Sequence, residues 1–249
     1  MTIKTFSIFG VQRSGTNFCE TLINNNFEDI SDFKYVWKHT PDVHEVQKVY
    51  HRLDMKNHLH MVVVKNPYKW IESIKRNPVD IAVTIKGMKE VSSLSKAEIL
   101  NCDTEFQWSE KNLIRPKEWF VKDLSIPQLI HLYNNFYRNW LAMKSKMKYW
   151  GIVRYEALLS IENSSSFLGN MSHAFKLIPK LQNDWKYPLK VHMSPSWENV
   201  RAEKTKDYID QHIIKTLTDD QIQIIHDNLD IQLIEKLGYQ TIKPKSILN

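Results

Sequence analysis

Hydrophobic and polar positions in the N-terminal third of the chain repeat the pattern of a strand, a loop and a helix. Thr5–Phe9 alternates apolar and polar side chains and runs into Gly10, which predicts a strand followed by a loop. Apolar residues at helical spacing follow over Thr16–Asn24. Further strands are predicted at Phe33–Trp37 and at His60–Lys65, whose continuous apolar centre is typical of a buried parallel strand.

The later elements continue this alternation of strands and helices. Helices are predicted over Tyr68–Arg76 and over Pro127–Met147, which carries a long apolar stripe, and a fourth strand is predicted at Tyr149–Arg154. One last helix begins with a capping box at Thr218 and stops before Gly238. The pattern predicts an α/β, three-layer P-loop-like fold with a central mainly parallel sheet flanked by helices.

The length of the chain suits a single domain. We expect its 249 residues to fold as one unit, with residues 77–123 as an insertion because they lack steady periodicity. Trp108 and Trp119 lie in this insertion, where they could stack on a sugar or aromatic ring or simply cover the core.

Charge and composition narrow the class of ligand and the expected location. The formal net charge of +6 favours anionic ligands, and no apolar run approaches the length that spans a membrane. Cys19 and Cys102 are too few for a disulfide framework, so we expect free thiols and a cytoplasmic protein. The positive residues are scattered rather than striped, so no nucleic-acid partner is expected. Without an apolar run of membrane-spanning length, no membrane partner is expected either.

The segment from Gly10 to Gly15 has the spacing of a nucleotide-binding P-loop but lacks its lysine. Thr16 stands where that lysine would reach the β- and γ-phosphates of a triphosphate, and Arg13 stands two positions before the second glycine. Backbone N–H groups before a helix form an anion site, to which Arg13 adds a planar fork of donors. The loop therefore predicts a phosphorylated ligand other than ATP.

Two further predicted strand ends carry candidate polar residues. Lys65 ends the third strand and Ser73 follows in the next helix, while Lys38 and His39 follow the second strand. Parallel α/β sheets bind ligands at the carboxyl ends of their strands, so these residues could face one cleft. Each residue taken alone is more often solvated or structural, and the constellation rather than any single member points to a site.

Five short segments, taken in order, resemble motifs of the PAPS-dependent sulfotransferases, which use 3′-phosphoadenosine 5′-phosphosulfate (PAPS). The segments are Gly10-Val-Gln-Arg-Ser-Gly-Thr, Lys38-His39-Thr40-Pro41, Lys65-Asn-Pro with Ser73, Val153-Arg-Tyr-Glu-Ala-Leu-Leu and Leu233–Tyr239. Each motif is short, but their order and rough spacing agree with that family from residue 5 to residue 240. The resemblance implies transfer of a sulfuryl group from PAPS to a hydroxyl or amine, without a metal ion.

The resemblance also implies roles for individual residues. The donor would be bound by Arg13, Ser14, Gly15, Thr16, Asn17, Phe18, Lys65, Ser73, Tyr155 and Arg201. Of these, the residues from Arg13 to Asn17 would hold the phosphosulfate, and Lys65 with Ser73 the 3′-phosphate. Catalysis would fall to His39 as general base, with Lys38 and Arg13 stabilising the charge of the transferred and leaving groups.

Several departures from the family pattern leave alternatives open. Lys65 replaces an arginine and cannot form a bidentate fork, and the usual C-terminal phosphate clamp is absent, with Arg201 and Lys204 as possible substitutes. Glu20, one helical turn after Thr16, is a rival to His39 as the base.

Other functions are also compatible with the sequence. One is a small-molecule kinase with an atypical P-loop, and another is a non-catalytic module that binds an anionic polymer or nucleic acid. The acceptor could be a small molecule, a carbohydrate or another hydroxyl or amine compound, and the sequence does not identify it. His51, His58 and His60 have no spacing typical of a zinc site, so no metal is expected.

Overall fold

The central sheet has four parallel strands in the order β2-β1-β3-β4. They are β1 (Thr5–Phe9), β2 (Ser31–Asp32), β3 (His58–Val64) and β4 (Tyr149–Arg154). The computed structural model describes residues 2–34, 38–39, 43, 46–47, 51, 56–76, 125–181, 184–187, 190–191, 200–201, 214 and 216–242.

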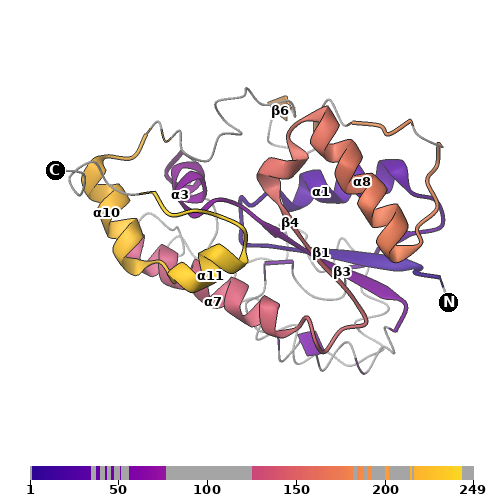
Figure 1. Ribbon diagram of the computed structural model, residues 1–249, viewed down its shortest axis with the longest axis horizontal. Helices are drawn as coiled ribbons and strands as arrows, with labels where there is room; N and C mark the ends of the chain where they lie inside the picture. The colour runs from indigo at the N-terminus through magenta and orange to yellow at the C-terminus, as the bar shows by residue number, and fades with distance from the viewer. Residues whose placement is uncertain are drawn as a thin grey trace, which may run out of the picture.

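Helices cover both faces of this sheet (Figure 1). One face is covered by α1 (Thr16–Asn26) and α8 (Ile161–Phe175). The other is covered by α3 (Pro67–Arg76), α7 (Ile126–Ala142), α10 (Asp219–Asn228) and α11 (Ile231–Lys236). A short 3-10 helix, η3 (Tyr155–Leu158), follows β4, and β5 (Lys190–Val191) pairs antiparallel with β6 (Val200–Arg201). The predicted three-layer α/β fold is confirmed.

Alternation along the strands builds a separate core on each face. All seven residues of β3 are buried; Leu59, Met61 and Val63 pack toward α1 and α8, whereas Val62 and Val64 pack toward α7. Successive side chains of a strand point to opposite faces, so a strand buried on both faces must be apolar at nearly every position. This requirement explains why β3 was recognisable from the sequence.

Strand boundaries agree closely with the predictions except at the second strand. The fourth strand is confirmed at Tyr149–Arg154. The second strand is Ser31–Asp32, earlier than predicted, and the N–H of Phe33 then donates to the carbonyl of Phe6 over 2.8 Å. Residues 35–37 of the predicted strand lie outside the described residues.

The prediction of one continuous C-terminal helix is wrong, because the chain breaks between α10 and α11. Leu229 adopts extended backbone angles, and the side chain of Asp230 accepts a hydrogen bond from the N–H of Leu233 over 3.0 Å. Asp230 therefore caps a second helix, which the uninterrupted apolar pattern concealed. Both helices still bury the expected apolar side chains, among them Ile225 and Leu233.

Two further differences concern α7 and α8. The helix α7 ends at Ala142, and turns occupy 143–146 where the helix was predicted to continue. No helix was predicted at α8, although Ser160 caps it by accepting from the N–H of Asn163 over 3.1 Å. The predicted insertion at 77–123 lies outside the described residues.

None of the helices in the described ranges is long and apolar enough to cross a membrane.

We predict that two buried histidines make folding stability depend on pH. Burial lowers the pKa of His60 to about 3 and also lowers the pKa of His58, whose ring nitrogens lie 2.7 and 2.9 Å from the hydroxyls of Thr5 and Ser7. In the unfolded chain these histidines have the ordinary pKa of about 6.5 and bind protons below that pH, whereas in the folded chain they stay neutral. The free energy of unfolding is therefore greatest above about pH 6.5 and decreases as the pH falls.

The measurement is the urea unfolding free energy between about pH 7.5 and pH 5. His60→Gln should reduce the loss on acidification by up to about 1.4 kcal/mol per pH unit below 6.5, because it removes one buried imidazole. The control is His131→Gln, at an exposed position on α7. An unchanged slope in His60→Gln contradicts the prediction.

Candidate functional site

The loop from Gly10 to Gly15 joins β1 to α1 and depends on its two glycines. Gly15 caps the helix at φ 94° and ψ 21°, a left-handed conformation, and a Cβ there would collide with the ring of Tyr155. At Gly10, a Cβ would collide with the hydroxyl of Ser14 and lie 2.7 Å from the carbonyl oxygen of Val63. Only glycine allows the loop to approach its neighbours this closely.

Two hydrogen bonds attach this loop to the rest of the fold, and a third lies within it. The indole N–H of Trp70 donates to the carbonyl of Gln12 over 2.7 Å, and the N–H of Ser14 donates to the carbonyl of Val11 over 3.1 Å. The N–H of Gly10 donates to the carbonyl of Lys38 over 3.0 Å. The loop immediately precedes α1. The first N–H groups of this helix lack intrahelical acceptors, as at any helix start, and they can donate to an anion.

Lys65 connects the loop with the segment between β3 and α3. Its Nζ donates to the hydroxyl of Ser73 and, over 3.4 Å, to the carbonyl of Arg13. The same Nζ lies 5.3 Å from the centre of the Tyr155 ring. The fold therefore brings together four of the predicted site residues, although Arg13 and Tyr155 lie 142 positions apart in the chain.

Three buried tyrosines satisfy the carbonyl groups where β3 ends. The hydroxyl of Tyr137 donates to Val63 over 3.0 Å, and that of Tyr133 donates to Lys65 over 2.7 Å. The single O–H of Tyr239 is shared between the carbonyl of Val64, at 3.1 Å, and a carboxylate. Burial raises the pKa of Tyr133 and of Tyr239, so both phenols remain protonated donors. These residues position Lys65, whereas the apolar pattern of α7 predicted only an aromatic core stripe.

A buried carboxylate joins this strand end to η3. One oxygen of Glu156 accepts from the N–H of Asn66 over 3.0 Å, and the other accepts from the hydroxyl of Tyr239 over 2.5 Å. Close by, Arg154 donates to the carbonyl of Gly238 over 2.7 Å. The segments Val153–Leu159 and Leu233–Tyr239, far apart in the sequence, are therefore in direct contact.

The predicted base and its neighbouring lysine lie against the other side of the loop. Lys38 donates from Nζ to the side-chain oxygen of Asn17, and Nδ1 of His39 lies 2.6 Å from the carbonyl oxygen of Gly10. Because a carbonyl only accepts, Nδ1 carries the proton and Nε2 is the basic nitrogen of the neutral ring. Desolvation, with the charge of Lys38 adding to it, lowers the pKa of His39 to about 3. Desolvation also lowers the pKa of Lys38.

Glu20, the rival base, is held in an ion pair. Its carboxylate lies 2.9 Å from Nζ of Lys34, which also lies 3.2 Å from Asp32. The Glu20 carboxylate is therefore engaged by a lysine that follows β2.

The aromatic residues beside the loop form a small cluster. Phe18 is buried and meets the rings of Tyr155 and Tyr187 edge-on, with centroids 6.4 and 5.7 Å away. Tyr187 was not predicted, because no local pattern distinguishes it. Lys69 was also missed: it is buried one helical turn before Ser73, on the same face of α3.

Two buried polar groups near Lys65 lack the hydrogen bonds expected of them. Among the described residues, Nδ2 of Asn66 has no partner. The hydroxyl of Ser14 likewise has no partner of good geometry there, although the hydroxyl of Tyr137 lies near it. Buried polar groups are nearly always satisfied, so these two side chains retain hydrogen-bonding capacity for water or a ligand.

The structure does not connect Arg201 with this site. Its backbone pairs with Lys190 in the small antiparallel sheet, and its side chain and Lys204 lie outside the described part of the chain. In the same described part, no group of three or more His, Cys, Asp or Glu side chains is arranged to hold a metal ion.

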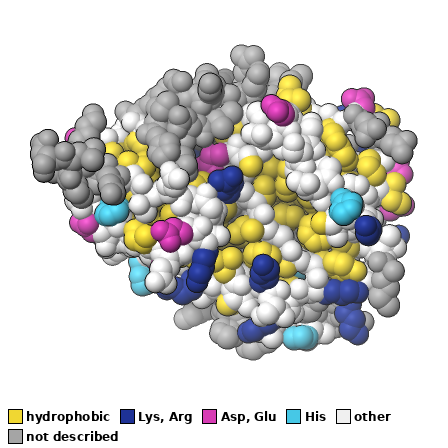
Figure 2. Space-filling model, in the orientation of Figure 1, with side chains coloured by type: hydrophobic (Ala, Val, Ile, Leu, Met, Phe, Trp, Pro, Cys, Tyr) yellow, Lys and Arg dark blue, Asp and Glu magenta, His cyan; other side chains and the backbone are white. Residues whose placement is uncertain are grey.

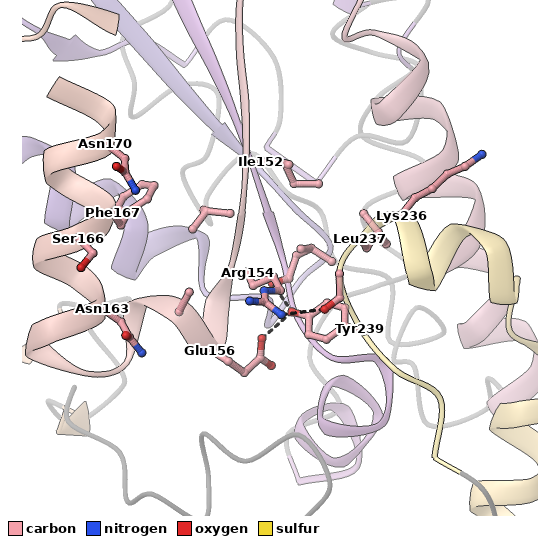
Figure 3. Close-up of a pocket in the computed structure, with 14 residues that line it drawn as sticks. Ile152, Arg154, Glu156, Asn163, Ser166, Phe167, Asn170, Lys236, Leu237 and Tyr239 are labelled. Atoms are coloured by element: carbon pink, nitrogen blue, oxygen red, sulfur yellow. Dashed lines mark hydrogen bonds between the residues drawn. The ribbon is translucent and has the colours of Figure 1, made fainter. Parts of the chain in front are cut away.

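A cleft of about 890 Å³ lies elsewhere, along β4 between α8 and α11 (Figure 3). Arg154 and Glu156 line it, whereas Tyr155 between them faces Gly15 and Lys65. The η3 turn thus separates this cleft from the loop.

No protein-family model, curated protein or solved structure matches the chain.

We predict opposite effects of alanine at two glycines. Gly15→Ala should lower the unfolding free energy by about 1–3 kcal/mol, because alanine must adopt positive φ and displace Tyr155. Gly169→Ala is the matched control: nothing lies within 4 Å of its Cβ position in α8, so it should stabilise by up to about 1 kcal/mol. Urea denaturation measures the unfolding free energy of both variants. Equal changes would contradict the requirement for glycine at position 15.

Proposed function

We propose that this protein is a sulfotransferase that uses PAPS as its donor. The observation that carries the proposal is the position of Lys65, whose Nζ contacts Ser73 and the backbone of Arg13 beside the Tyr155 ring. Residues expected to bind two different anionic groups of one nucleotide thus converge from three segments of the chain. Sites for phosphate and sulfate commonly combine a helix N-terminus with lysine or arginine side chains.

The properties of the loop support a donor with a phosphosulfate tail. Arg13 and the start of α1 provide cationic and N–H groups, and the buried hydroxyl of Ser14 is a further donor. Lys65 and Ser73 would hold the 3′-phosphate. The Tyr155 ring, next to Phe18, would contact the nucleoside.

Proton removal from the acceptor would fall to His39. Its bond to Gly10 leaves Nε2 as the basic nitrogen, and the ion pair with Lys34 makes Glu20 the weaker candidate. In transfer, the acceptor oxygen or nitrogen forms a bond to sulfur while the bond from sulfur to the phosphate oxygen of PAPS breaks. The acceptor proton passes to His39, and Arg13 and Lys38 stabilise the charge on the departing phosphate. Residues for acceptor binding are expected in 77–123.

We predict that the product nucleotide, 3′-phosphoadenosine 5′-phosphate, binds without magnesium. Lys65→Ala should weaken this binding by roughly tenfold or more, because it removes a charged partner worth about 1.5–3 kcal/mol. Isothermal calorimetry measures the affinity, with Lys4→Ala as control, since Lys4 is exposed at the amino end of β1. The proposal fails if the wild type does not bind the nucleotide. Binding of ATP with magnesium in its place would favour a kinase.

We also predict an unusual pH dependence of turnover. His39 must be neutral to accept a proton, and its pKa is lowered to about 3 by desolvation. The acid limb of kcat/KM therefore lies well below pH 6.5, and turnover should not fall tenfold per unit between about pH 6.5 and pH 5. The measurement is the rate at which the labelled sulfuryl group of PAPS is transferred to an acceptor identified by screening. Where no acceptor is identified, hydrolysis of labelled PAPS is followed instead.

His39→Ala provides the control for this profile. It should lower kcat by roughly 100-fold or more while changing nucleotide affinity by less than about threefold. Equal losses of turnover and affinity would assign His39 to donor binding rather than to proton transfer.

A further inference from the structure

A second binding site is suggested by the cleft along β4, outside the donor loop. Its floor comes from the carboxyl-terminal half of β4, one wall from α8 and the other from the end of α11 (Figure 3). Its volume of about 890 Å³ is within the range of small-molecule sites. Ile152 remains 37% exposed there, and Phe167 adds a half-buried ring from α8.

The most distinctive polar group of the cleft is the guanidinium of Arg154. It is held in place from one side, because Nη1 donates to the carbonyl of Gly238 and the group lies 5.9 Å from the centre of the Tyr239 ring. Only one of its five N–H donors is used in this bond. The other donors of this exposed group remain for a ligand, and such a planar fork suits carboxylate, phosphate or sulfonate oxygens.

The other polar groups of the cleft favour an anion as well. Lys236 stands at its rim, with its amino group extending outward (Figure 3). Glu156 is the only carboxylate among the described lining residues, and both of its oxygens already accept hydrogen bonds from within the protein. Asn163 and Asn170, two turns apart on the same face of α8, add amide groups.

Hydrophobic side chains gather between α8 and α11, with Lys and Arg side chains beside them (Figure 2). An apolar surface next to a fixed cation favours a ligand with an apolar body and one anionic head. We propose that this cleft binds an amphipathic organic anion, with its head on Arg154 and its apolar part against Ile152 and Phe167.

This site is separate from the catalytic one proposed above. His39 bonds to the loop after β1, whereas the cleft lies beside β4, two strands along the sheet in the order β2-β1-β3-β4. Neighbouring strands are about 4.8 Å apart, so the ends of β1 and β4 are roughly 10 Å apart. Lys65 and Tyr155 of the proposed donor site lie closer, next in sequence to the cleft residues Val64 and Arg154. The η3 turn stands between the two sites, with Tyr155 facing the loop and Arg154 facing the cleft. The proposal does not depend on the sulfotransferase assignment.

The test uses 8-anilinonaphthalene-1-sulfonate, an amphipathic organic anion whose fluorescence rises in apolar surroundings, titrated into the full chain. Arg154→Gln should weaken its binding about tenfold, as expected for loss of a charged hydrogen-bonding partner. Lys236→Gln should weaken it about twofold, since this rim charge is exposed. Ser166→Trp should also weaken it, by filling the cleft from α8. Saturating 3′-phosphoadenosine 5′-phosphate should leave binding unchanged.

Controls separate this site from general hydrophobic binding. Lys144→Gln removes an exposed charge after α7, away from the cleft, and should have no effect. The uncharged N-phenyl-1-naphthylamine should bind more weakly than the sulfonate and should not respond to Arg154→Gln. Circular dichroism checks folding. If Arg154→Gln does not fold, Lys236→Gln and Ser166→Trp decide the question.

Two results would overturn the proposal. One is unchanged affinity for the sulfonate in the folded cleft variants, and the other is its complete displacement by the nucleotide. Failure of the nucleotide to bind at all would instead remove the sulfotransferase proposal and leave the cleft standing.

Discussion

The hydrogen bonds that satisfy the carbonyl end of β3 are the constraint on which the candidate site depends. This strand is buried on both faces, so its last carbonyls need partners from within the protein. The hydroxyls of Tyr133, Tyr137 and Tyr239 provide them from α7 and from the segment after α11. Lys65 follows directly and therefore emerges in a fixed direction toward the loop after β1.

Rigid neighbours also determine the shape of that loop. Gly10 lies against β3, Gly15 lies against the Tyr155 ring, and Trp70 holds Gln12 from α3. Because each contact comes from a different element, the loop holds its shape only when the sheet and its helices are assembled. The Glu156 carboxylate extends this assembly to η3, whose residues face the loop on one side and the cleft along β4 on the other.

Much of the fold was predictable because hydrophobic periodicity reports burial directly. The β4 boundaries and the alternation of strands and helices followed from the apolar pattern. Predictions failed where a local polar cap overrode that pattern: Asp230 starts a new helix inside an apolar run, and Ser160 starts α8. In the site, the glycine loop and Lys65 were predictable from spacing, whereas Tyr187, Lys69 and the tyrosine hydroxyls were not. Their roles come from contacts between distant segments.

The sequence by itself determined the α/β class, the loop between Gly10 and Gly15 and the set of cationic residues at strand ends. These features depend on local periodicity, on backbone freedom and on residue type. Only the tertiary structure decided which of these residues meet: Lys65 with Ser73, Lys38 with Asn17, and Glu20 with Lys34 rather than with the loop. It alone also revealed the cleft beside Arg154. The physical reason is that hydrogen bonds and ion pairs act over a few ångströms in space, and only the packed sheet sets those distances.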